Sequence, residues 1–93
     1  MIISFGCKYT EKIWKGEHSN TWNSQIVNIA LRKLFMVNAA NNIKDLMIPP
    51  SNRLHKLQGD MSEYWSISVN MQWRIIFKWE EGEASDVQLV DYH

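Results

Sequence analysis

The period of the hydrophobic pattern changes along the chain, from about four residues in the first half to two in the second. Apolar side chains at every fourth position are typical of an amphipathic helix and predict one from residue 22 to about residue 40. The positions of this stripe are Trp22, Ile26, Ala30 and Leu34. Thr21 precedes the stripe as a candidate N-cap, and the Asn41-Asn42 pair follows it as an interruption.

Shorter elements are predicted on both sides of this helix. Thr10 is a candidate N-cap for a short helix that stops near Gly16. Residues 1–5 form a short apolar run and predict a strand, and residues 43–47 predict one further helical turn. The Pro49-Pro50 pair then ends helical structure, because proline lacks the N–H that a helix interior requires.

The second half predicts three strands. Residues 65–69 alternate apolar side chains with serine, as a half-buried strand does. Residues 73–79 place three tryptophan or phenylalanine side chains and Ile75 on one face, and Arg74 and Lys78 on the other. Residues 87–90 form the last strand. Connections this short predict an antiparallel meander.

These elements predict an α+β fold: a compact single domain over residues 1–93, with an N-terminal strand and helices packed on one face of a small, mainly antiparallel twisted sheet. The helices are expected to cover the Trp-rich face. No run of 18 apolar residues and no signal-peptide pattern is visible, and the single cysteine cannot form an internal disulfide. We therefore expect a cytoplasmic protein without a membrane segment.

Charge is distributed unevenly along a chain whose net charge is zero. Residues 1–59 contain eight Lys/Arg against three Asp/Glu, a balance of +5, whereas residues 60–93 contain two against seven, a balance of −5. This asymmetry favours a basic surface that faces an anionic partner. A chance imbalance in a small protein explains it equally well, so charge alone leaves both interpretations open.

The chain ends on Asp91, Tyr92 and His93, directly after the last predicted strand. A strand beside Arg74 would bring these three residues to one rim of the uncovered sheet face, and His55 precedes the meander as a further imidazole. RNA carries its own nucleophile, the 2′-hydroxyl, so its cleavage needs a base, an acid and positive charge on the phosphorane. Histidine titrates near neutral pH and arginine binds phosphate through two parallel hydrogen bonds.

Each of these residues also has a structural interpretation. A terminal histidine is commonly solvated, and His55 beside Lys56 has the pattern of an ordinary surface residue. Arg74 is about as well explained by an ion pair across the sheet as by phosphate binding. The three histidines are too widely spaced to predict a metal site, and no cofactor is predicted.

Three stretches of the second half resemble one toxin family. They are PPSNRLHKLQGD at 49–60, YWSISVNMQWRIIF at 64–77 and VDYH at 90–93. In order and spacing they resemble the HigB toxins, the plasmid maintenance killer branch of the RelE/ParE superfamily. The resemblance extends over nearly the whole chain.

The resemblance implies the toxin of a type II toxin–antitoxin system. Such a toxin is an endoribonuclease that cleaves mRNA during translation in the ribosomal A site. A HigA-like helix-turn-helix antitoxin holds it inactive, and the complex binds operator DNA. Two other classes stay open: a ParE-like inhibitor of DNA gyrase, which shares the fold, and an RNA-binding module that cleaves nothing.

The resemblance also implies roles for individual residues. Its W-R motif matches Arg74, and its histidine motif matches His55, where related members have Glu. Some members have a basic residue at the position of Asn70, and its absence leaves fewer groups to stabilise the phosphorane. The residues implied in catalysis are His93, Asp91, Tyr92, Arg74 and His55, and those implied in RNA binding are Arg53, Lys56 and Lys78.

Overall fold

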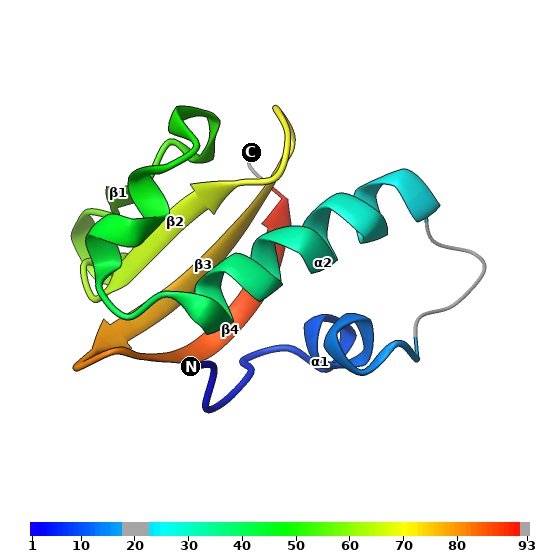
Figure 1. Cartoon of the computed structure of the whole chain (residues 1–93), viewed down its shortest axis with the longest axis horizontal. Coiled ribbons are helices and arrows are strands. Elements are labelled where there is room, and N and C mark those ends of the chain that lie inside the picture. Colours follow the sequence, from blue (N-terminus) through cyan, green and yellow to red (C-terminus); the bar gives the residue numbers. More distant parts are fainter. Residues whose placement is uncertain (18–22, 92–93) are drawn as a thin grey trace.

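The computed structural model describes residues 1–17 and 23–91, in which two helices lie on one side of a four-stranded antiparallel sheet (Figure 1). The helices are α1 (Lys8–Lys15) and α2 (Ser24–Ala39), and three 3₁₀ turns follow as η1 (Ile43–Met47), η2 (Pro50–Asn52) and η3 (Gly59–Met61). The strands are β1 (His55–Lys56), β2 (Tyr64–Ser68), β3 (Trp73–Glu80) and β4 (Glu83–Asp91), in the order β1-β2-β3-β4. The predicted α+β fold is confirmed. In the described residues no helix is long and apolar enough to cross a membrane.

Helix α1 begins two residues before the predicted cap. Cys7 occupies the N-cap position, and Gly16 ends the helix with a positive φ of 76° that glycine adopts at little cost. The prediction that Thr10 caps the helix is wrong. Thr10 lies inside the helix, fully buried, and its Oγ1 accepts a hydrogen bond of 2.8 Å from the backbone N–H of Leu89 in β4. The hydroxyl satisfies a strand donor instead of a helix donor.

Helix α2 matches the predicted helix closely. Its N-cap is Asn23, whose Oδ1 accepts hydrogen bonds from the backbone N–H groups of Gln25 and Ile26. The predicted cap Thr21 and the first stripe residue Trp22 lie outside the described residues. Of the remaining stripe residues, Ala30 and Leu34 are buried and Ile26 is half-buried, and Val27 and Val37 of the same helix are buried as well. The predicted turn at 43–47 is also present, as η1.

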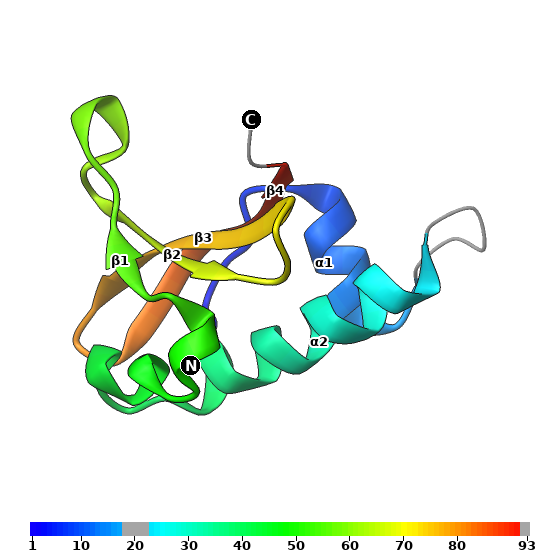
Figure 2. The same ribbon diagram turned by 90° about the horizontal axis from the view of Figure 1, so that it is seen from above.

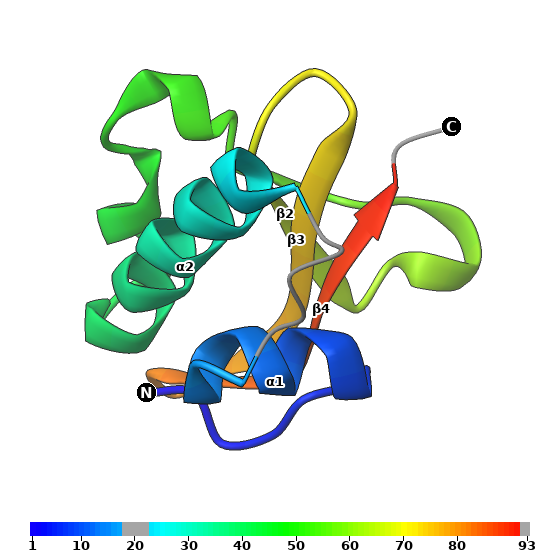
Figure 3. The ribbon, with the colours of Figure 1, turned by 90° about the vertical axis from the view of Figure 1, so that its right-hand side faces the viewer.

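The two faces of β3 are arranged as the alternation predicts. Ile75 and Phe77 are fully buried against the helices, and Trp73 and Trp79 pack at the edges of the same core. Arg74 and Lys78, four residues apart on the strand, both lie on the opposite face. Figure 2 and Figure 3 show both helices on one side of the strands, which leaves the other side without a covering layer.

Strand β4 is longer than predicted, because it begins at Glu83 instead of residue 87. Its register against β3 shifts between Ile76 and Lys78, where Asp86 adopts a positive φ of 55°. This bulge breaks the alternation on which the sequence-based prediction rests. The predicted N-terminal strand runs parallel to β4 as two isolated bridges, Ile2 to Ala84 and Phe5 to Val87.

Candidate active site on the open sheet face

The sheet face turned away from the helices, called here the open face, carries a connected group of polar side chains. The strand register shows which residues belong to this face, because residues directly opposite each other on antiparallel strands point to the same side. His55 lies opposite Ser66, and Ser66 lies opposite Ile76. Ser68 lies opposite Arg74, and Tyr64 lies opposite Lys78.

His55 and Arg74 meet on this face. The Nη1 atom of Arg74 is 3.0 Å from Nε2 of His55, and Nδ1 of His55 is 2.9 Å from the carbonyl oxygen of Arg53. A carbonyl only accepts and a guanidinium only donates, so this arrangement assigns the proton to Nδ1 and leaves Nε2 as the acceptor. In this arrangement the Nε2 lone pair is directed at Arg74.

Local turns position both side chains. Arg53 ends η2 in a left-handed conformation, with φ of 49°, which turns its carbonyl toward the His55 ring. On the other side, Asn70 Oδ1 accepts hydrogen bonds from the backbone N–H groups of Gln72 and Trp73, at 2.8 and 2.7 Å. These bonds fix the β2–β3 turn immediately before Arg74.

The centre of the open face is covered by its own side chains. Ser66 is fully buried and Ile76 is 5% exposed, so the face is less open than the sequence suggests. Within the described residues, Ser66 Oγ has no hydrogen-bond partner. Ser66 lies opposite His55. Its hydroxyl is the one buried polar side-chain atom without a hydrogen bond among the described residues.

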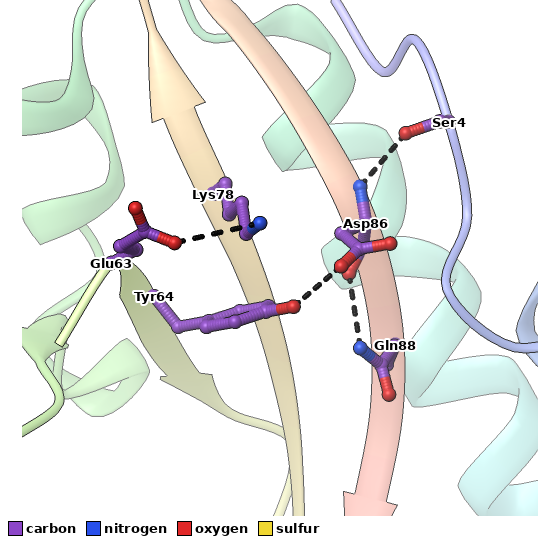
Figure 4. Close-up of polar contacts among 6 residues, drawn as sticks. All are labelled: Ser4, Glu63, Tyr64, Lys78, Asp86 and Gln88. Carbon is purple, nitrogen blue, oxygen red and sulfur yellow. Dashed lines mark hydrogen bonds and ion pairs between the residues drawn. The ribbon is translucent and has the colours of Figure 1, made fainter. Parts of the chain in front are cut away.

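A second polar group lies farther along the open face (Figure 4). The Tyr64 hydroxyl donates a hydrogen bond of 2.5 Å to Asp86, while Lys78 pairs with Glu63 at 3.6 Å and lies 5.4 Å from the Tyr64 ring centroid. The hydrogen bond to Asp86 raises the pKa of Tyr64, and burial and the negative charges of Asp86 and Glu63 raise it further. Tyr64 is therefore a neutral donor at cellular pH. Its pairing with Asp86 was invisible in the sequence, because the bulge in β4 creates it.

The predicted RNA-binding residues differ in their surroundings. Arg53 is exposed beside His55. Lys56 lies opposite Trp65 and its Nζ is 5.7 Å from that ring, so it points to the other side of β1 from His55. Lys78 already has Glu63 as a partner. The structure thus brings together Arg53, His55 and Arg74, and separates Lys56 from them.

The end of β4 lies beside the β2–β3 turn, next to Arg74, as expected (Figure 1). Asp91 lies opposite Trp73, so strand alternation places it on the helix-covered side and not on the face of Arg74. Its Oδ2 accepts a hydrogen bond of 3.2 Å from Gln72. Tyr92 and His93 lie outside the described residues. In the described ranges no three His, Cys, Asp or Glu side chains are grouped as metal ligands.

Comparison with known proteins identifies the family of this chain. The family described as "RelE-like toxin of type II toxin-antitoxin system HigB" matches residues 3–93. Toxin HigB-1 of Vibrio cholerae is 37% identical over 90 residues, which are 96% of this chain and 95% of that protein. Endoribonuclease HigB of Proteus vulgaris is 46% identical over 41 residues, 44% of this chain and 45% of that protein.

Solved structures share the fold at low sequence identity. The YoeB–YefM complex from Staphylococcus aureus contains a chain that matches with a TM-score of 0.65 at 15% identity, covering 100% of this chain and 95% of that one. YafQ from Escherichia coli matches with a TM-score of 0.63 at 18% identity, covering 98% and 91%. The match over residues 3–93 and the near full-length relative together show that the chain belongs to the HigB-like family of RelE-like toxins of type II toxin–antitoxin systems.

Proposed function

We propose that this toxin is an endoribonuclease that cleaves mRNA on the translating ribosome, using the 2′-hydroxyl of the RNA as nucleophile. The observation that carries the proposal is the His55 ring, held by the Arg53 carbonyl with Nε2 directed at the Arg74 guanidinium. A base and a phosphate-binding cation in contact are what the first step of such a cleavage needs. The name of the Proteus vulgaris relative, an endoribonuclease, supports the same reaction.

The arrangement suggests an order of events. Arg74 binds the scissile phosphate through its planar fork, and this replaces its hydrogen bond to His55. The freed Nε2 of His55 accepts the proton of the adjacent 2′-hydroxyl, and the O2′–P bond forms. The Arg53 carbonyl keeps its hydrogen bond to Nδ1 and so steadies the imidazolium that results. Arg74 stabilises the added charge on the phosphorane.

Departure of the 5′-oxygen needs an acid. We assign it to the terminal residues, with His93 as the proton donor, Tyr92 as a contact to a base or the phosphate, and Asp91 as the group that orients His93. Breaking the P–O5′ bond then leaves a 2′,3′-cyclic phosphate and a 5′-hydroxyl. No step requires a metal ion, because the nucleophile belongs to the substrate and the charge is supplied by Arg74.

We place the reaction on the ribosome because the chain has zero net charge. Free RNA is bound mainly through phosphate contacts, which a strongly basic surface provides. Here the basic residues at the open face are few, so the ribosome supplies the docking surface. Arg53 and Arg74 are then enough for the local contacts, with Lys56 and Lys78 at the margins.

We also propose that a HigA-like antitoxin binds the helical side and leaves the open face uncovered. Phe35 of α2 is 57% exposed, and its ring lies 5.1 Å from that of Trp14 in α1. The exposed Phe35 ring beside the half-buried Trp14 fits a protein-binding surface. Asn28, exposed on the same helix, is a further candidate contact, and binding of operator DNA by the assembled complex belongs to the same proposal.

Induction of the protein in growing cells, followed by mapping of new 5′ ends, tests the proposal. New ends within translated frames are expected, and they should disappear in His55→Ala. DNA damage with intact messages would instead favour a ParE-like inhibitor of gyrase. Binding to ribosomes without new ends would favour an RNA-binding module.

A further inference from the structure

A pocket lies beside the His55–Arg74 pair, since Arg53 and Ser68 line it. It is a pocket of about 250 Å³ between α2, the η2 turn and the β2–β3 turn. Lys33 and Arg53 supply its positive charge, Ser68 and Asn70 its polar wall, and Met71 its rim. Ser68, which lines the pocket, lies directly opposite Arg74 in the sheet, so the pocket is next to the candidate active site.

Lys33 is fixed in this pocket by a buried residue. Its Nζ donates a hydrogen bond of 2.6 Å to Oδ1 of Asn52, which is fully buried. Asn52 is in turn fixed by its Nδ2, which donates to the carbonyls of Leu46 at 3.2 Å and Ile48 at 3.5 Å. The ammonium therefore has a defined position, unlike that of an ordinary surface lysine.

Among the described residues, no acidic side chain neutralises the positive charge of the pocket. No carboxylate lines the pocket, and within the described residues neither Lys33 nor Arg53 forms an ion pair. Burial lowers the pKa of Lys33, and the neighbouring Arg32 lowers it further, so an anion beside the ammonium would be stabilising. An ammonium has three donors, and the bond to Asn52 uses one of them.

We propose that this pocket binds an RNA phosphate next to the scissile one, with Lys33 and Arg53 as its ligands. The Met71 side chain, 95% exposed at the rim, provides an apolar surface for the base of the same nucleotide. This inference rests on the proposed function, because it assumes that Arg74 holds the scissile phosphate. It adds a binding residue from α2, outside the motifs of the second half.

The test compares Lys33→Met with Arg32→Met on ribosomes programmed with a short synthetic mRNA. Arg32 is the exposed neighbour of Lys33 on α2 and does not line the pocket. Lys33→Met should lower kcat/KM for cleavage by about tenfold to a hundredfold, the usual effect of losing a charged hydrogen bond. Arg32→Met should change it by less than about threefold.

Messages with one uncharged methylphosphonate linkage identify the phosphate concerned. When the linkage 5′ or 3′ to the scissile phosphate is made neutral in turn, one of the two should weaken cleavage by the unaltered protein and leave Lys33→Met unaffected. Arg53→Asn is a second variant, since asparagine tolerates the left-handed backbone of this position and does not touch Asn52. Arg53→Asn should show the same selective loss. If Lys33→Met turns out to have a lowered melting temperature, the result for Arg53→Asn decides the test.

The inference is overturned if the unaltered protein cuts the message while Lys33→Met and Arg53→Asn behave like Arg32→Met. It is also overturned if both variants cut more slowly than the unaltered protein whichever of the two linkages is made neutral. If the unaltered protein does not cut mRNA at all, the proposed function fails, and the inference that rests on it fails too. The two failures are thus distinguished by the unaltered protein.

Discussion

His55 and Arg74 face each other across the open face, with Nε2 of the imidazole 3.0 Å from Nη1 of the guanidinium. The two residues come from strands that are not neighbours, since β2 lies between β1 and β3. The Arg53 carbonyl holds the far side of the ring, at 2.9 Å from Nδ1. In this chain of contacts the acceptor atom of the imidazole becomes available when a phosphate binds Arg74.

His55→Ala should lower the rate of mRNA cleavage by about 10²–10⁴-fold, the usual contribution of a general base. The side chain is exposed, so the melting temperature should stay within a few degrees of that of the unaltered protein. Single-turnover cleavage on programmed ribosomes measures the rate. Lys44→Ala, an exposed cation on η1, is the matched control. Equal rates for His55→Ala and Lys44→Ala would remove His55 from the reaction.

Arg74→Lys should also lose most of the activity, because a point charge cannot reproduce the planar fork that binds two phosphate oxygens. Since Arg74 and His55 act in the same step, on the scissile phosphate and on the adjacent 2′-hydroxyl, the double variant should be less impaired than the product of the two single effects predicts. Rates of the four proteins, measured under single-turnover conditions, give the coupling. Independent effects of the two substitutions would contradict a shared role.

Deletion of His93 should abolish most of the toxicity while the fold and antitoxin binding are kept. The expected loss is about 10²–10⁴-fold in cleavage rate, because the terminal imidazole is proposed as the acid. His93→Gln retains the chain length and the terminal carboxylate, so it separates the imidazole from the position of the chain end. If the shortened chain folds, binds the ribosome and cuts at the normal rate, the acid lies elsewhere.

The Tyr64–Asp86 hydrogen bond predicts a pH dependence of stability. The folded state raises the pKa of Tyr64 above 10.0, so it holds the phenol proton more tightly than the unfolded chain. The resulting stabilisation is complete below about pH 10 and is lost as the pH rises above that value. Tyr64→Phe should therefore cost about 1 kcal/mol at neutral pH and flatten the alkaline decline.

Urea unfolding between pH 7 and 11 measures this dependence. Asp86→Asn is the matched variant, because asparagine keeps the shape and tolerates the positive φ of this position. It should flatten the alkaline decline, because removing the negative charge brings the pKa of Tyr64 in the folded protein closer to that in the unfolded chain. The same decline in all three proteins would show that the Tyr64–Asp86 pair does not contribute.

Sequence patterns predicted the parts of the fold that depend on regular alternation. Helix α2 and the core face of β3 were predicted because burial repeats there with the period of the element. The start of β4 was missed, since the bulge at Asp86 interrupts the alternation and three of the first four residues are polar. Thr10 was misplaced because its hydroxyl serves a strand N–H far away in sequence.

The candidate site was predicted only in part. His55 and Arg74 were both identified, but their contact depends on a two-residue strand and on the left-handed backbone of Arg53, which no local pattern indicates. Lys33 was not recognised at all. Its position depends on Asn52, which is 19 residues away in the chain. Contacts of this kind arise from packing between distant segments, and a single sequence does not encode them as a pattern.

The chemistry of the cut ends tests the central claim most directly. Purified protein is incubated with ribosomes programmed with a defined mRNA, and the products are compared with those from an mRNA carrying one 2′-deoxynucleotide on the 5′ side of the cut. We predict 5′-hydroxyl ends and 2′,3′-cyclic phosphates from the first message, and no cut at that site in the second. Intact mRNA, or equal cleavage of the deoxy-substituted message, would contradict the assignment of this toxin as a nuclease that uses the 2′-hydroxyl of its substrate.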